Sequence, residues 1–110
     1  MENKRETQLL AQGKELFNKN ALTKAQQTFE EVIEANPSCS EAFFFIGNIF
    51  HIKGQLGKAV KAFNKVIEID PNHTDAAISL SVILNDIGKY EEAKEIFARA
   101  QGHDDFLQRA

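Results

Sequence analysis

The sequence has few of the residues that build disulfides, metal sites or rigid turns. Its 110 residues include one cysteine, two prolines and no tryptophan. The single Cys39 excludes an internal disulfide, and one thiol with three scattered histidines supplies too few ligands for a zinc site. We therefore expect no metal and no cofactor, in a reducing compartment.

Long apolar runs and an excess of basic charge are also missing. No apolar segment approaches the ~20 residues that cross a bilayer, and the N-terminus has no apolar run behind its charges. The formal net charge of -3 gives no long-range attraction to phosphate backbones or anionic lipids. We expect a soluble, cytoplasmic protein that binds neither nucleic acid nor membrane.

The patterns that carry catalysis are missing as well. There is no glycine loop that would cradle a phosphate, no metal-spaced cluster and no nucleophile with a base at motif spacing. Cys39 falls at a predicted helix start, where the dipole would lower the pKa of its thiol somewhat, but no histidine or asparagine pattern accompanies it. We expect an incidental thiol and a protein that is not an enzyme.

What the chain does have is a repeat. Its 43% hydrophobic and 26% charged residues are typical of a globular protein, and the length fits one domain over 1–110. Several residue types recur at a period of 34. The recurring sets are Ala25, Ala59 and Ala93; Phe29, Phe63 and Phe97; Gly13 and Gly47; Gly54 and Gly88; and Pro37 and Pro71.

Within each period the apolar residues fall at the three- and four-residue steps of two amphipathic helices. In the later units the helices are predicted over about 39–52, 56–69, 74–87 and 90–101. Asn20 stands where Gly54 and Gly88 stand in those units, and Asn is the next-best residue after Gly for a left-handed helix end. All three turns therefore have matching chemistry.

Capping residues are predicted between the units. Pro37 should end the first unit, and Ser38 with Glu41 has the pattern of a capping box for the next helix. Asn72 or Thr74 is expected to cap the helix after that.

The clearest unit resembles a tetratricopeptide repeat. The residues that carry the resemblance are Phe43, Ile46, Gly47, Phe50, Ala59, Phe63 and Pro71. The resemblance implies an all-α superhelix of three helix-turn-helix units, over about 6–39, 40–73 and 74–105. Residues 103–110 would form a short C-terminal helical segment, either a cap or the stump of a further helix.

The third unit departs from the pattern. Ser81 replaces the glycine of the earlier units, Ala77 replaces the large residue at the fourth position, and Asp105 stands where the closing proline should be. Ile87 stands where Lys19 and Lys53 were, and would be exposed unless Phe106 or Leu107 covers it.

The resemblance also implies a non-catalytic interaction module. In this family the concave face is lined mainly by the first helix of each unit and binds peptides or proteins. We call the corresponding surface of this chain the groove. Its predicted residues are Leu10, Lys14, Phe17, Glu41, Phe44, Phe45, Asn48, His51, Ile52, Asp75, Ile78, Val82, Asn85 and Asp86, with Thr7, Asn18 and Ser79 beside them.

A groove of this composition suits an amphipathic helix or an extended peptide with apolar anchors, and Lys or Arg of the ligand would face Glu41, Asp75 and Asp86. One subfamily binds acidic chaperone tails through a clamp of Lys, Asn and Arg. In this sequence four of the positions that would form the clamp hold Leu10, Phe45, Asp75 and Ser79, so chaperone-tail binding is not expected.

Four alternatives stay open. Phe44 and Phe45 could be packed between units rather than face a ligand, and His51 could be an ordinary surface histidine. The exposed ends or the groove could instead bind a second copy, which would make this a structural homo-oligomer. The chain could also be an interaction fragment of a longer scaffold.

Overall fold

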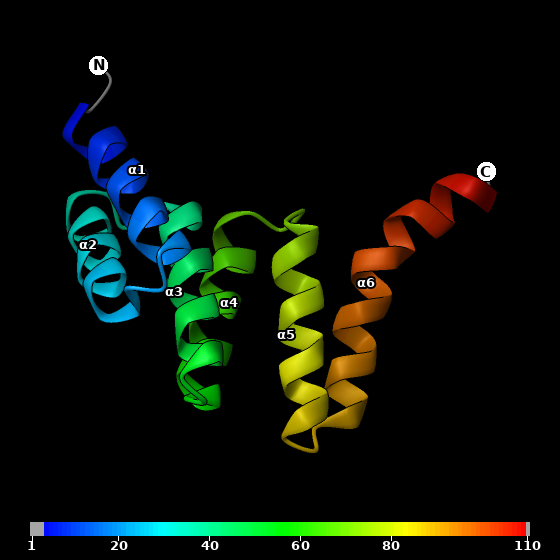
Figure 1. The fold of residues 1–110 in the computed structure, drawn as a ribbon. Helices are drawn as coiled ribbons and strands as arrows, with labels where there is room; N and C mark the ends of the chain where they lie inside the picture. The colour runs from blue at the N-terminus through cyan, green and yellow to red at the C-terminus, as the bar shows by residue number, and fades with distance from the viewer. Residues whose placement is uncertain (1–3, 110) are drawn as a thin grey trace.

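The structure, a computed structural model, describes residues 4–109, with side chains as far as Ala100. These residues form only helices and their connections (Figure 1). The helices are α1 (Lys4–Asn18), α2 (Leu22–Ala35), α3 (Ser40–Ile52), α4 (Leu56–Ile69), α5 (Thr74–Asp86) and α6 (Tyr90–Arg109).

The helices form three antiparallel hairpins, as the 34-residue period predicts. α1 packs on α2, α3 on α4 and α5 on α6, and the hairpins are joined through contacts of α2 with α3 and of α4 with α5. We call the contact between the first two units the first junction and that between the last two the second junction. The predicted all-α superhelix of three units is confirmed.

The C-terminal end differs from the prediction in one respect. The segment after residue 101 is helical, but its backbone continues α6 to Arg109 instead of forming a separate short helix. The side chains of Phe106 and Leu107 lie outside the described residues, as does that of Asp105. Ile87 is partly exposed, at 41%.

The turn inside each hairpin has the predicted left-handed residue. Asn20 has φ 65°, Gly54 has φ 78° and Gly88 has φ 87°. The amide of the next residue bonds the carbonyl five positions back, with N to O distances of 2.9, 2.8 and 2.8 Å in the three units. This bond satisfies a carbonyl at the helix end, and it requires the left-handed residue before it.

The connections between units correct the predicted caps. The Asn36 side-chain oxygen accepts a hydrogen bond from the Ser38 amide at 3.1 Å, so Ser38 belongs to a turn over Pro37. The capping box is therefore wrong: α3 begins at Ser40, and its cap position, Cys39, makes no side-chain cap bond.

The same turn recurs one unit later. The Asp70 carboxylate accepts a hydrogen bond from the Asn72 amide at 3.3 Å. Neither Asn72 nor Thr74 caps α5, contrary to the prediction. Instead Nδ1 of His73 accepts a hydrogen bond from the Ala76 amide at 3.1 Å.

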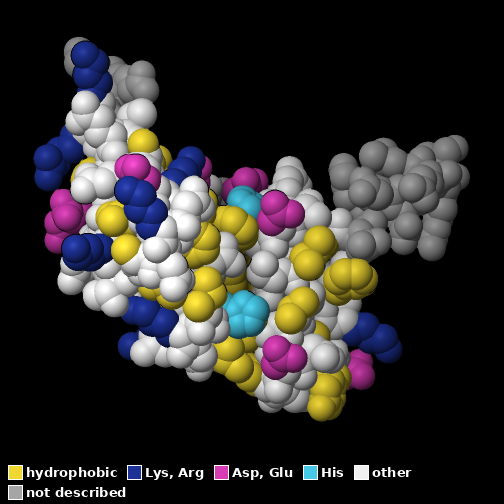
Figure 2. All heavy atoms as spheres, viewed as in Figure 1, with side chains coloured by type: hydrophobic (Ala, Val, Ile, Leu, Met, Phe, Trp, Pro, Cys, Tyr) yellow, Lys and Arg dark blue, Asp and Glu magenta, His cyan; other side chains and the backbone are white. Residues whose placement is uncertain are grey.

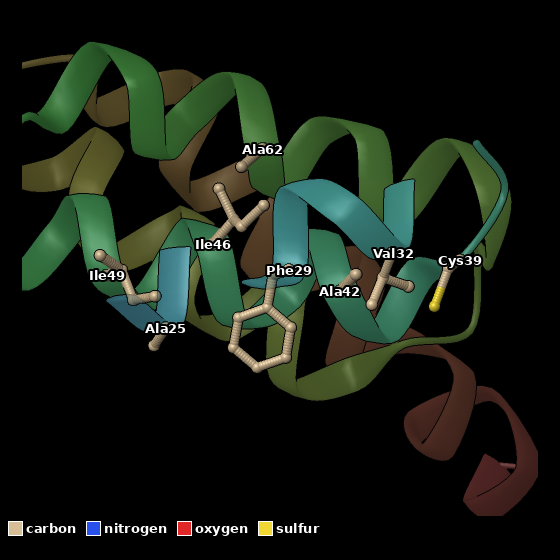
Figure 3. Close-up of a cluster of buried hydrophobic side chains, with 8 residues drawn as sticks. All are labelled: Ala25, Phe29, Val32, Cys39, Ala42, Ile46, Ile49 and Ala62. Carbon is tan, nitrogen blue, oxygen red and sulfur yellow. The ribbon is translucent and has the colours of Figure 1, made fainter. Parts of the chain in front are cut away.

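The core lies at the junctions, because each helix pair leaves an apolar stripe that only a neighbouring unit can cover. At the first junction, Ala25, Phe29 and Val32 of α2 lie near Ala42, Ile46 and Ile49 of α3 (Figure 3). Ala59, Phe63 and Val66 of α4 lie with Ala76, Leu80 and Ile83 of α5 at the second junction. Each fully buried Phe stabilises the fold by about 1.5–3 kcal/mol.

Glycine sets the closest approach within the first two hairpins. A Cβ atom on Gly13 would lie 2.7 Å from the ring of Phe29, and one on Gly47 would lie 2.8 Å from the ring of Phe63. Both rings are fully buried. In the third hairpin Ser81 occupies the glycine position, and the ring of Phe97 is 45% exposed.

Candidate functional site

All predicted groove residues lie on the first helices of the hairpins. Leu10, Lys14 and Phe17 are on α1. Glu41, Phe44, Phe45, Asn48, His51 and Ile52 are on α3, and Asp75, Ile78, Val82, Asn85 and Asp86 are on α5. Over α3 and α5 the surface shows hydrophobic side chains beside acidic and histidine side chains (Figure 2).

Phe45 is largely a packing residue of the first junction. Its ring stacks on that of Phe29 with centroids 5.1 Å apart and meets the edge of Phe17 at 5.3 Å. Leu10 and Phe17 of α1 also pack against this cluster and are half-buried. The apolar residues at this end of the groove therefore hold the first two units together.

Phe44 packs at the second junction. Its ring contacts the edge of Phe63, with centroids 5.9 Å apart, and lies 4.8 Å from the imidazole of His73. Phe44 is half-buried. Its contacts link α3 to α4 and to the start of α5.

The charged groove residues differ in whether they are already paired. Lys14 of α1 and Glu41 of α3 form a salt bridge across the first junction. Asp75 and Asp86 of α5 are both exposed, and neither takes part in a salt bridge among the described residues. The second half of the groove therefore has uncompensated negative charge.

Two apolar groove residues face solvent. Ile52 is 58% exposed and Val82 is 47% exposed. Ile78, Asn48 and His51 are half-buried. The part of the predicted groove that is both apolar and accessible thus lies toward the C-terminal halves of α3 and α5.

The candidates for chemistry among the described residues are potential metal ligands and the one thiol. No group of three or more potential metal ligands comes together there. Cys39 is buried, and burial raises the pKa of its thiol, with the nearby Glu6 and Glu41 carboxylates raising it further. The predicted lowering by the helix dipole is wrong, because desolvation outweighs the lowering effect that the backbone amides of Ala42 and Glu41 have on the thiol pKa.

Sequence reasoning missed two features near the groove. One is the His73 cap, whose imidazole also contacts Phe44. The other is a pocket of about 460 Å³ between α5 and α6, lined in part by Ser81, Val82 and Phe97. The signal for the pocket was present, since Ser81 replaces a glycine whose missing side chain admits a buried ring in the other two units.

Comparison with family models identifies the repeat. One model described as the tetratricopeptide repeat matches residues 10–74, more than half of the chain. The chain belongs to the tetratricopeptide repeat family. A second model with the same description matches residues 51–108, so the two matches together reach all three hairpins.

Solved tetratricopeptide repeat structures have the same arrangement of helices. A crystal structure of MamA is 21% identical, has a TM-score of 0.88 and covers 96% of this chain. The TPR2B domain of yeast Sti1, in a pHsp70 complex, is 22% identical, has a TM-score of 0.87 and covers 97% of this chain and 86% of its own. Yersinia enterocolitica SycD, a type III secretion translocator chaperone, is 17% identical, has a TM-score of 0.85 and covers 92% of this chain and 76% of its own.

At these identities the likeness shows the fold alone. The chain spans 61% of the length of the MamA structure that it matches. A search of curated proteins finds no match by sequence. Within the described part of the chain, no helix is long and apolar enough to cross a bilayer.

Proposed function

We propose that this tetratricopeptide repeat protein is a non-catalytic adaptor whose groove binds a peptide or helix of a partner protein. The observation that carries the proposal is the exposure of Ile52 and Val82, at 58% and 47%, on the first helices of neighbouring units. Exposed aliphatic side chains on neighbouring first helices can be buried together against the apolar face of a partner. A cytoplasmic location and a single binding domain over 1–110 belong to this proposal.

The chemistry of the groove favours an apolar ligand with basic residues. Ile52 and Val82 offer contacts to aliphatic or aromatic anchors, while Asp75 and Asp86 offer charge to Lys or Arg. The exposed amide of Asn85 can bond a ligand's backbone. Lys14 adds little attraction for an acidic ligand, because Glu41 already neutralises it.

The same features argue against an acidic chaperone tail, although the Sti1 structure with a similar fold is a pHsp70 complex. Of the positions that would form the clamp, Asp75 is acidic and Phe45 is stacked on Phe29. A carboxylate entering there would meet like charge and an aromatic ring. The shared fold therefore does not carry over the ligand.

Affinity capture from a lysate tests the proposal with a matched pair of variants. Ile52→Ser is expected to lose the partner, because it removes an exposed anchor without touching the core. Ile87→Ser makes the same chemical change at another partly exposed isoleucine, outside the groove, and should retain the partner. Thermal unfolding checks that both variants keep the wild-type stability within about 0.5 kcal/mol.

The groove is the wrong surface if both variants capture the same proteins as the wild type. An equal loss of partner capture by both variants would also count against the groove, because Ile87 lies outside it. Phe44 is less suitable for substitution, since its ring packs on Phe63 and a loss of binding could not be separated from a loss of stability.

A further inference from the structure

The free side of the third unit has a pocket that no part of the described chain fills. It lies between α5 and α6, measures about 460 Å³, and is lined in part by Ser81, Asn85, Tyr90, Lys94 and Phe97. We call these five residues the open end. The pocket borders the groove, since Val82 and Asn85 belong to both.

In the first unit the equivalent place is occupied. Phe17 and Phe29 stand two periods before Asn85 and Phe97. The ring of Phe45, from the next helix of the chain, stacks on Phe29 and meets the edge of Phe17. The open end therefore corresponds to a site that, in the first unit, receives an aromatic side chain of the next helix.

Exposure of the aromatic rings shows that the site in the third unit is unfilled. Phe29 and Phe63 are fully buried, but Phe97 is 45% exposed. Tyr90 is 64% exposed, whereas Leu56, one period earlier, and Leu22, two periods earlier, are half-buried. Ser81 contributes by occupying the glycine position, because a side chain there conflicts with a fully inserted ring.

We propose that the open end binds an amphipathic helix of a partner protein, which continues the stack as α3 continues it from the first unit. The first junction supplies the template for the bound helix. There α3 presents Ala42, Phe45, Ile46 and Ile49 to the preceding hairpin, in the order Ala-x2-Phe-Ile-x2-Ile. The partner helix carries a small residue, an aromatic residue and two aliphatic residues at that spacing.

Charged residues at the edge of the open end further define the sequence of the helix that would bind there. At the first junction Nζ of Lys53 donates hydrogen bonds to Oγ1 of Thr23 and Oε1 of Gln26, each at 3.3 Å. The residues two periods after Thr23 and Gln26 are Glu91 and Lys94. The bound helix therefore ends in a basic residue that faces Glu91, with an acidic neighbour for Lys94.

A second copy of this chain does not supply such a helix by head-to-tail stacking. In α1 the positions equivalent to Ala42, Ile46 and Ile49 are Gln8, Gln12 and Glu15, and all three are exposed. Stacking α1 on the open end would place polar side chains against Phe97. Between these two sources of a separate helix, a different protein therefore fits the open end better than a second copy.

A titration with a synthetic helix tests the proposal. The probe carries Ala-x2-Phe-Ile-x2-Ile on one face and a Lys-Glu pair at its C-terminal end, and the control peptide has the same composition with the apolar stripe scrambled. We expect amide resonances around Tyr90, Lys94 and Phe97 in the ¹⁵N-labelled protein to shift with the probe and not with the control. Equal shifts with both peptides, shifts confined to α1 and α3, or no shifts at all would overturn the proposal.

Variants separate this surface from the groove. Tyr90→Ser and Phe97→Ser should each weaken binding of the probe by about tenfold, while Ile52→Ser leaves it unchanged. Tyr90 is mostly exposed, so its variant keeps the test valid if Phe97→Ser unfolds. Light scattering across a concentration range is the second arm: a dimer that Tyr90→Ser abolishes would assign the open end to a second copy and contradict the proposal.

Discussion

At the scale of single residues, the pairing of a glycine with a buried phenylalanine decides how closely each hairpin can pack. Gly47 lies so near the ring of Phe63 that an added Cβ atom would approach it to 2.8 Å. The ring is fully buried and cannot move outward without opening the second junction. In the third unit Ser81 stands at the glycine position, and Phe97 is partly exposed.

Gly47→Ala should therefore destabilise the protein by about 1–3 kcal/mol, the usual cost of overpacking a core. Urea unfolding followed by circular dichroism measures the change. The matched control is Gly57→Ala in α4, because a Cβ atom there meets nothing within 4 Å. That variant should be neutral or more stable, since alanine is preferred over glycine in a helix by up to about 1 kcal/mol. Equal stability of the two variants would show that the Gly47 contact has no energetic weight.

The thiol of Cys39 should react slowly in the folded protein. Burial raises its pKa, so less of the reactive thiolate is present near pH 8.5, about the ordinary pKa of a cysteine. Alkylation by iodoacetamide at that pH should be slow in buffer and fast in denaturant. As the pH rises, the folded-state rate should reach half its maximum above the ordinary thiol pKa. A half-maximum below that value would mean that the helix dipole dominates after all.

At the scale of the helices, the sequence could predict the turns inside the hairpins better than the connections between them. The left-handed turn depends on one residue, and only Gly and Asn adopt that conformation readily, so Asn20, Gly54 and Gly88 were recognisable. The connections depend on several competing side chains. Asn36 binds the amide of Ser38 and removes Ser38 from the role of a cap, and pattern alone could not rank these two interactions.

Gly54→Ala tests the turn at this scale. The side chain would meet nothing within 4 Å, so any loss of stability comes from the backbone conformation, at φ 78°. We expect a loss of about 1–2 kcal/mol in the free energy of unfolding, the cost of the left-handed region for an L-residue with a Cβ atom. Asn20→Gly should cost nothing or stabilise slightly. A neutral Gly54→Ala would mean that the turn relaxes to another conformation.

At the scale of the whole molecule, periodicity could predict the fold and the helix on which each groove residue lies. It could not predict which of those residues are consumed by packing, because burial at a junction depends on the neighbouring unit's side chains. The position of Phe45 within the repeat predicts that it lines the groove, yet its ring stacks on that of Phe29. Lys14 and Glu41 likewise pair with one another, as only the arrangement of α1 against α3 reveals.

The accessible groove is therefore narrower than the predicted one. It comprises mainly Ile52, Val82 and the acidic residues of α5, while the aromatic residues beneath support it. Groove binding and binding at the open end are separate claims: Ile52 is exposed in the groove alone, and Tyr90 and Phe97 are exposed at the open end alone, although Val82 and Asn85 border both surfaces. The first of these is the central claim about function.

Photo-crosslinking from single positions tests that claim most directly. A photoreactive amino acid in place of Ile52 lies in the groove, and the same amino acid in place of Ile87 lies outside it. Both positions are exposed to solvent. We predict that a partner protein is crosslinked from position 52 and is not crosslinked from position 87. Crosslinking from position 87 alone would contradict the account. So would the absence of crosslinking from position 52 under conditions in which the wild-type protein still captures its partner.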